Sequence, residues 1–332
     1  MRYSQSEKME IIKLVEKSDL GVVRTLKEIG INKSTFYKWY SLYQEFGYDG
    51  LAFRYVRPKQ FWNEIPDEEK VRIVELALEY PEKSSREIAW HVTDTYGYYI
   101  SESSVYRILK ANDLIQTPDY EVLEAYDKFP RPTEHINELW QTDFTYFKIV
   151  HFGWYYLATV IDDYSRYVIT WKLCKTMQTL EVKDVLDEAI KLTGVGHVNV
   201  VHKPRLLTDN GPCYVSGEMK DYMEKQGMIH TRGKPYHPMT QGKIERYHRS
   251  MKNVIKLVNY YTPTQLEDQM NLFVAYYNNY RYHESLENVT PADMYYGKQN
   301  KILKKRKAVK KKTMAERRYY FEKRIESNGV KL

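Results

Sequence analysis

Three carboxylates in this chain have residue types and a spacing that suit divalent-metal chemistry. Asp143 lies in the segment WQTDFTYF, Asp209 in LLTDNGPCY and Glu245 in HPMTQGKIERYHR, with 35 residues between the second and the third. Mg²⁺ prefers carboxylate oxygens and keeps several of its waters, so two Asp and one Glu can hold it. Two such ions about 4 Å apart can activate a water or a hydroxyl for attack at phosphorus and stabilise the leaving oxygen. The pattern therefore predicts metal-dependent phosphoryl transfer.

Each acid by itself has a plainer explanation. Asp143 could lie on an exposed edge strand, Asp209 could cap a turn with the Asn-Gly pair that follows it, and Glu245 could lie on a solvated helix face. The functional interpretation therefore depends on the three acids acting together.

The segments around the acids indicate which elements must position them. Three consecutive runs between Leu139 and Cys174 are rich in β-branched and aromatic residues, which predicts an antiparallel meander. Shorter elements alternate after it: a helix through 182–189, a strand at 205–208, a helix at 216–226, a strand at 228–232 and a long helix from about 238 to 258. This order predicts an α/β core with a mixed five-stranded sheet and helices on its faces.

The motifs that contain the three acids resemble the catalytic core of DDE transposases and retroviral-type integrases, and the match is close to bacterial insertion-sequence transposases. The matching segments are WQTD at 140–143, VIDDYSR at 160–166, TDNG at 208–211, and HP at 237–238 through GKIER at 242–246. The 35-residue spacing is also that of the family, and YNNYRYHESL at 277–286 with TPA at 290–292 is similar to its post-core segment. The resemblance covers about residues 135–297.

This resemblance implies a ribonuclease-H-like core and a polynucleotidyl transferase that uses two Mg²⁺ or Mn²⁺ ions. It implies that Asp143 bridges the ions and that Asp209 and Glu245 each complete the ligands of one ion. The implied reaction is 3′-end nicking of double-stranded DNA at element ends, followed by strand transfer into target DNA. We expect a homo-oligomer on DNA, located in the cytoplasm with the nucleoid, with no membrane partner and no small-molecule substrate.

Two features depart from the family pattern. Tyr282 stands where the post-core segment usually has proline, and the zinc-binding His/His/Cys/Cys module of retroviral integrases is absent. We expect the first departure to affect only a turn, and the second implies that helical domains bind the DNA ends. Asp162 and Asp163 compete for a metal role, but their position is structural in the family. We therefore expect Asp163 to stabilise a turn together with Arg166.

Two similar segments precede the core. A capping box at Ser4 and Glu7, followed by apolar residues at helical spacing, begins a pattern of three short helices that recurs from Pro66 onward. Residues 32–40, NKSTFYKWY, align without a gap on residues 101–109, SESSVYRIL. Three short helices with a tight turn are typical of helix-turn-helix domains, although other small helical bundles share the pattern.

Several polar residues are predicted to contact DNA. The third helix of each segment places Ser, Thr, Lys or Arg opposite its apolar stripe, where base edges and phosphates are met in a major groove. Lys243 and Arg246 share one side of the helix that contains Glu245 and could follow a DNA backbone, or could simply be solvated. The full set is Ser34, Thr35, Lys38, Ser103, Ser104, Arg107, Lys243 and Arg246.

The positive charge is concentrated at the C-terminus. Residues 301–332 hold 13 Lys and Arg against 3 Asp and Glu, whereas the first 300 residues hold 38 against 41. A basic tail indicates contact with a polyanion, or a solvated segment that aids solubility. The predicted organisation is a helix-turn-helix domain at 1–46, a linker at 47–65, a second such domain at 66–115, a linker at 116–135, the catalytic core at 136–260, a post-core helical segment at 261–300 and a basic tail at 301–332.

Composition excludes several other classes of protein. Cys174 and Cys213 have 38 residues between them and form neither a CxxC pair nor a disulfide framework. The longest uncharged apolar run, 154–161, is far shorter than the roughly 20 residues of a membrane helix, so we expect a soluble protein. Two alternative functions are a DNA-binding regulator with an idle core and a metal nuclease that does not join DNA. The three intact acids disfavour the first, and only a joining assay separates the second.

Overall fold

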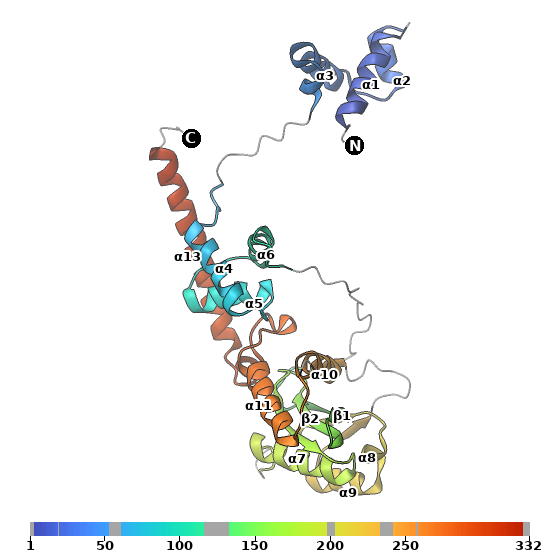
Figure 1. Ribbon diagram of the computed structural model, residues 1–332, viewed down its shortest axis with the longest axis vertical. Coiled ribbons are helices and arrows are strands. Elements are labelled where there is room, and N and C mark those ends of the chain that lie inside the picture. Colours follow the sequence, from blue (N-terminus) through green and yellow to red (C-terminus); the bar gives the residue numbers. More distant parts are fainter. Residues whose placement is uncertain are drawn as a thin grey trace. The chain divides into compact units, whose positions relative to one another are not determined.

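A computed structural model describes residues 3–18, 20–52, 61–115, 133–197, 203–232, 242–256 and 258–327. The chain forms two compact units, Met1–Glu64 and Ile65–Leu332 (Figure 1). Within the described residues, no helix is long and apolar enough to cross a membrane.

The first unit is a bundle of short helices, as predicted. It contains α1 (Gln5–Glu16), α2 (Val22–Glu28), α3 (Lys33–Phe46) and the 3-10 helix η1 (Gly47–Leu51). The side chain of Ser4 accepts a bond from the Glu7 amide and Asn32 accepts one from the Ser34 amide, so both predicted caps are present. Leu51 is only 1% exposed and packs in the core of this unit. The predicted linker at 47–65 therefore starts too early, because an apolar residue at 51 completes the core; residues 53–60 lie outside the described part.

The second unit begins with another helical domain, residues 65–115. Its helices are α4 (Asp67–Glu79), α5 (Ser85–His91) and α6 (Glu102–Ala111), and a single π-helical turn, η2 (Val92–Tyr96), follows α5. Ser101 caps α6 by accepting a bond from the Ser104 amide. A separate apolar core holds the three helices together, with Ile73, Leu76, Ile88, Ala89, Val92, Ile100, Val105 and Leu109 buried. The predicted recurrence of the three-helix pattern is confirmed.

A mixed five-stranded sheet forms the middle of the second unit. Its strands are β1 (Leu139–Ile149), β2 (Gly153–Asp162), β3 (Val168–Cys174), β4 (Arg205–Thr208) and β5 (His230–Arg232), in the spatial order β3-β2-β1-β4-β5. The first three strands are antiparallel, whereas β4 is parallel to β1 and β5 is parallel to β4. The predicted sheet is therefore confirmed. Most of the predicted 116–135 linker, residues 116–132, lies outside the described part.

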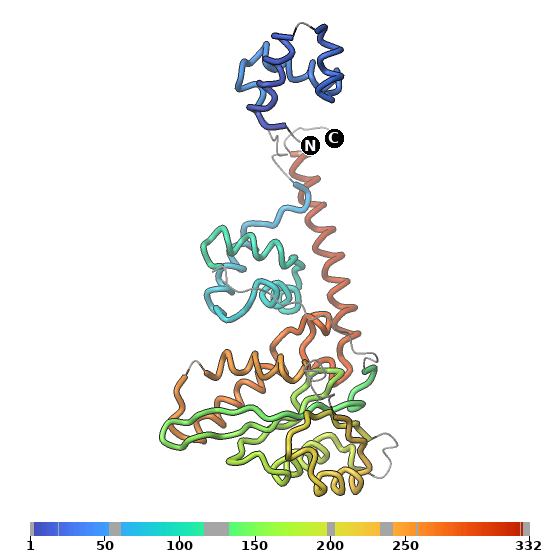
Figure 2. Tube along the Cα trace, turned by 90° about the vertical axis from the view of Figure 1, so that its right-hand side faces the viewer, coloured from blue at the N-terminus to red at the C-terminus, as the bar shows by residue number. Residues whose placement is uncertain are grey.

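Helices bury both faces of this sheet (Figures 1 and 2). Side chains on β2 alternate between two apolar clusters, because Ala158 and Val160 contribute to one and Leu157 and Ile161 to the other. The first cluster includes residues of α7 (Thr179–Thr193), α8 (Pro212–Val215) and α9 (Gly217–Gln226). The second includes residues of α10 (Gly242–Ile255) and α11 (Pro263–Asn279).

The C-terminal part of the chain is helical. After η4 (Glu284–Leu286) and α12 (Pro291–Tyr295), one long helix, α13, extends from Gln299 to Ser327. The predicted basic tail at 301–332 is thus largely a helix, since Lys, Arg, Ala and Met favour helix and one side of it is covered. Arg306 and Thr313 lie on that covered side, with exposed fractions of 5% and 0%.

Candidate active site

The register between two parallel strands brings the first two acids together. Leu139 of β1 pairs with Arg205 of β4, and Gln141 pairs with Leu207. If this pairing is continued by two residues along each strand, Asp143 comes level with Asp209. Asp209 directly follows the last residue of β4. The two acids therefore lie at the same edge, where β4 ends and β1 continues.

The turn after β4 holds Asp209. Its Oδ1 accepts a 2.8 Å bond from the amide of Gly211, as expected for the Asn-Gly turn. A Cβ at position 211 would lie 3.0 Å from that same oxygen, so glycine permits this close approach. Burial raises the pKa of Asp209, the charge of Asp143 raises it further, and the Gly211 bond lowers it.

The third acid is positioned by the apolar side of α10. Ile244, Tyr247 and Met251 are buried in the cluster beneath the sheet, which leaves Glu245 directed outward at the start of the helix. Burial raises the pKa of Glu245, and repulsion by Asp143 adds to this, whereas Arg249 and His248 lower it. The negative charge of Asp143 thus raises the pKa of both other predicted acids.

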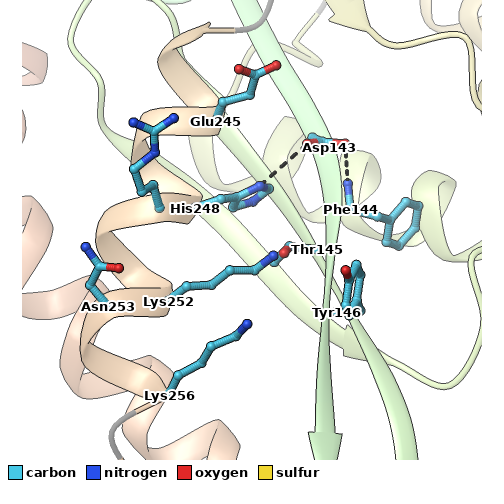
Figure 3. Close-up of a pocket in the computed structure, with 10 residues that line it drawn as sticks. Asp143, Phe144, Thr145, Tyr146, Glu245, His248, Lys252, Asn253 and Lys256 are labelled. Atoms are coloured by element: carbon cyan, nitrogen blue, oxygen red, sulfur yellow. Dashed lines mark hydrogen bonds and ion pairs between the residues drawn. The ribbon is translucent and has the colours of Figure 1, made fainter. Parts of the chain in front are cut away.

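An open cleft of about 660 Å³ lies between β1 and α10 (Figure 3). Asp143 lines it from β1 and Glu245 from α10, and the His248 Nδ1 atom lies 3.5 Å from the Asp143 Oδ2 atom. The Asp143 Oδ1 atom accepts a 2.8 Å bond from the Phe144 amide. Asp209 is not among the residues that line this cleft, which are Asp143, Phe144, Thr145, Tyr146, Glu245, His248, Arg249, Lys252, Asn253 and Lys256.

Positive side chains continue the cleft along α10. Arg249, Lys252 and Lys256 follow Glu245 at helical spacing, and the Lys252 ammonium lies 4.8 Å from the centre of the Tyr146 ring (Figure 3). Burial and the charge of Lys256 lower the pKa of Lys252, while Asp143 raises it. Carboxylates at one end and cations along the rest suit a metal-bound phosphodiester. Sequence reasoning did not assign Lys252 or Lys256, although the positions i+7 and i+11 from Glu245 indicate the same helix side.

A buried hydrogen-bond network fixes the start of α10. The Ile244 amide donates to Gln141 Oε1 at 3.1 Å, and Gln141 Nε2 donates to Asp163 Oδ1 at 2.6 Å. Lys243 forms an ion pair with the other Asp163 oxygen. The network therefore ties the start of α10, next to Glu245, to Gln141 of β1, two residues before Asp143.

These contacts change the expected roles of two residues. The predicted turn contact between Asp163 and Arg166 is present, but it runs through the backbone: the Arg166 guanidinium donates to the Asp163 carbonyl, whereas the Asp163 carboxylate binds Gln141 and Lys243. Lys243 was predicted to follow a DNA backbone with Arg246, yet its ammonium is held by the nearly buried Asp163 carboxylate. The sequence could not show this because Asp163 is 80 residues away. Arg246 is exposed and does not line the cleft.

Asp162 has a structural environment. It is fully buried, and its carboxylate accepts bonds from the Asn137 amide at 2.8 Å, the Ser165 amide at 2.8 Å and the Ser165 hydroxyl at 2.6 Å. These donors occupy both oxygens, as expected for an acid that organises a turn. The predicted motif at His237 and Pro238 lies outside the described residues.

The residues predicted to read DNA lie on the exposed sides of α3 and α6. Ser34, Thr35 and Lys38 are exposed on α3, and Ser103 and Arg107 are exposed on α6. Ser104 is half-buried, and its hydroxyl lies 2.9 Å from that of Ser101. Ser104 is thereby part of the cap of α6, which makes it the least accessible of the six.

The donor set suits a hard divalent cation, although the side chains do not form a closed cluster. Among the residues that the structure describes, no three His, Cys, Asp or Glu side chains lie close enough to hold a metal ion. The negative charge of Asp143 raises the pKa of Asp209 and of Glu245. A divalent cation would turn this repulsion into attraction, and Asp and Glu oxygens are the ligands that Mg²⁺ and Mn²⁺ prefer. The residue types therefore fit such an ion.

Comparison with known proteins finds relatives that match about a third to a half of the chain. The relatives include the Gag-Pro-Pol polyprotein of squirrel monkey retrovirus, 32% identical over 122 residues, which cover 36% of this chain and 6% of the polyprotein. They also include the transposase for insertion sequence element IS629 of Shigella sonnei, 25% identical over 192 residues, which cover 56% of this chain and 62% of that protein. The chain thus spans only a small part of the retroviral polyproteins that it matches.

Similar solved structures include the magnesium complex of the HTLV-2 integrase catalytic core domain, with 23% identity, a TM-score of 0.38, and coverage of 48% of this chain and 97% of that chain. Family models described as integrase core domain match residues 133–238 and 226–291. Models described as homeodomain-like domain match residues 2–52 and 35–109. The chain therefore contains an integrase core domain that is preceded by homeodomain-like helical domains.

Proposed function

We propose that this chain is a DDE-type DNA transposase, which binds the ends of a mobile element and cuts and joins DNA with Asp143, Asp209 and Glu245. The observation that carries the proposal is the β1–β4 register, because it brings Asp143 level with Asp209 while Glu245 lies across the cleft from Asp143. A strand, a turn and a helix that are far apart in the sequence would thus supply the three carboxylates. The named transposase and retroviral relatives support the same function at the level of the family.

The proposed site would hold two Mg²⁺ or Mn²⁺ ions, with Asp143 contributing to both. When bound, the ions supply polarisation of the attacking oxygen and stabilisation of the leaving 3′ oxygen. His248 lies 3.5 Å from Asp143 and would orient its carboxylate. Arg249, Lys252 and Lys256 would bind the phosphates of the DNA strand that occupies the cleft.

The helical domains would supply end recognition. In the proposed complex, Ser34, Thr35 and Lys38 of α3 contact one part of the end sequence, and Ser103 and Arg107 of α6 contact another. Because a transposition complex joins two ends to one target, we propose that the chain acts as a homo-oligomer on DNA, at the nucleoid.

The direct test measures nicking and joining of a labelled duplex that carries an element end. Asp143→Asn, Asp209→Asn and Glu245→Gln keep side-chain shape but remove the charge that holds a cation, so each should lower both rates by about 10³-fold or more. Asp184→Asn is the matched control, because Asp184 is a half-exposed acid on α7 that pairs with Lys172. EDTA should stop the wild-type reaction, and added Mg²⁺ or Mn²⁺ should restore it.

The alternative functions give different results in this assay. A nuclease would nick the duplex with the same metal dependence but would never join the freed 3′ hydroxyl to target DNA. A regulator with an idle core would bind end DNA and produce no nicks in any metal. Near-wild-type joining by Glu245→Gln would show that the third ligand is wrongly assigned.

A further inference from the structure

A buried arginine connects three parts of the second unit. Arg306 of α13 is only 5% exposed, and its Nε and Nη2 atoms donate to the two carboxylate oxygens of Asp94, at 2.9 and 2.6 Å. Asp94 lies in η2 of the second helical domain, 212 residues earlier. This paired geometry is the strongest form of an arginine–carboxylate contact, and it fixes both direction and distance.

The same guanidinium also holds the post-core segment. Its Nη1 atom donates to the carbonyl of Glu287 at 3.2 Å, and its Nη2 atom donates to the carbonyl of Asn288 at 2.9 Å. Both residues have positive φ, 55° and 59°, in the left-handed region that residues other than glycine seldom adopt. Such strained backbone persists where its surroundings determine it, and Arg306 binds both strained peptides.

Aromatic rings enclose this contact. The Arg306 guanidinium lies 4.3 Å from the centre of the Trp90 ring and 5.5 Å from that of Tyr282. The Tyr282 hydroxyl donates to Asp94 Oδ2 at 3.2 Å. Tyr282 is the residue that departs from the family pattern, and we expected it to affect only a turn. In the structure it instead completes the pocket that holds Arg306 and Asp94.

Further contacts follow the same boundary. The Tyr99 amide donates to the Thr313 hydroxyl at 3.0 Å, and the Arg317 Nε atom donates to the Tyr98 hydroxyl at 2.7 Å. Figure 2 shows α13 extending beside the second helical domain. One side of α13 therefore binds the loop that leads directly into α6, the helix predicted to read DNA.

We propose that Arg306 is a positioning residue that fixes the second helical domain to the post-core segment, so that DNA bound by α6 enters the cleft at one defined position. The proposal rests on the proposed transposase function. Although Arg306 lies in the most basic part of the chain, its charge is neutralised by Asp94 and does not serve DNA binding. Its removal should uncouple end binding from cleavage.

The test compares two substitutions that each remove one positive charge. Arg306→Met breaks the contact with Asp94, whereas Lys191→Met removes an exposed charge from α7, away from the cleft and from α13. We expect both variants to bind end DNA within about threefold of each other. Only Arg306→Met should lower the nicking rate, by tenfold or more, and spread the nicks over neighbouring positions. Arg306→Lys should be intermediate, because a lysine keeps the charge but loses the paired geometry.

A physical measurement separates this proposal from the proposed function. Hydrogen exchange should show faster exchange at the Tyr99 amide and across η2 in Arg306→Met, with wild-type exchange in β1 and β2. This result is independent of DNA, so it is obtained even if the wild-type chain does not cut. If Arg306→Met unfolds the whole unit, Tyr282→Phe removes only the hydroxyl contact and should shift exchange in the same direction. Equal effects of Arg306→Met and Lys191→Met on cleavage, or unchanged exchange at Tyr99 and η2, would overturn the proposal.

Discussion

The two helical domains have the same local plan but different surroundings. Phe36 of α3 and Val105 of α6 occupy equivalent positions of the aligned segments and are both buried. The core of the first domain is completed by the residues that directly follow its third helix. Leu51 is buried there, and the Lys8 ammonium donates to the Leu51 carbonyl at 3.0 Å. The second domain instead contacts α13 and the post-core segment through Asp94 and Tyr99. Recurrence of a helix pattern therefore predicts a shared fold, whereas residues outside the aligned segments determine how each copy is held.

The largest difference between the two helical domains should appear in their thermal unfolding transitions. Ile12 of α1 and Ile73 of α4 are both fully buried, each in its own apolar core. Truncation of either residue to alanine should cost about 2–5 kcal/mol through reduced burial and a residual cavity. Differential scanning calorimetry of the full chain should show that Ile12→Ala lowers only the transition of the first unit.

The companion substitution, Ile73→Ala, should lower the transition that contains the sheet. The reason is that α5, η2 and the loop before α6 contact α11, η4 and α13. If Ile73→Ala lowered a separate transition and left that of the sheet unchanged, the second helical domain would be as independent as the first.

Substitutions on the two helices predicted to read DNA bases should have the next largest effect, on binding to end DNA. Alanine at Ser34, Thr35 and Lys38 should weaken binding to end DNA, and each base-reading residue among them should contribute about 1–3 kcal/mol of specificity. The matched variant carries alanine at Ser103, Ser104 and Arg107. Binding titrations against end DNA and random DNA measure the difference, and equal losses on both would reduce the role of that helix to phosphate contact.

The caps of the two DNA-reading helices should have smaller effects. Asn32 accepts a 3.1 Å bond from the Ser34 amide, and Ser101 accepts a 3.3 Å bond from the Ser104 amide. Asn32→Ala and Ser101→Ala should each cost about 1 kcal/mol of stability in their own unit. Chemical denaturation checks this, and Asn32→Asp, which preserves a cap acceptor, should retain most of the stability.

Substitution of exposed lysines on α13 should have the smallest effect on DNA affinity when it is measured at a single salt concentration. Lys304, Lys307 and Lys311 are exposed, unlike Arg306. If these lysines bind phosphates, changing them to glutamine should make the slope of log affinity against log salt shallower by about 0.9 for each phosphate that is no longer neutralised. An unchanged slope would exclude this side of α13 from DNA binding. Substitution is a cleaner test than deletion of 301–332, because deletion also removes Arg306.

Local pattern was enough to predict most elements of this chain. The strand at 205–208 has the predicted bounds, and the caps at Ser4, Asn32 and Ser101 are present, because strand periodicity and capping depend on neighbours within a few residues. The types and spacing of Asp143, Asp209 and Glu245 also predict a shared site, and that site stays a prediction. Their roles in metal binding remain a prediction.

The tertiary structure alone decided which partners the polar residues have. Asp163 could be paired with Arg166 from proximity in sequence, yet its carboxylate binds Lys243, and Arg306 binds Asp94 rather than being simply part of a basic tail. Helix and strand formation is encoded by neighbouring residues, so it can be inferred from sequence periodicity. The choice of a partner for a buried charge depends on which distant segments the fold brings together, since such a charge must be neutralised wherever packing excludes water.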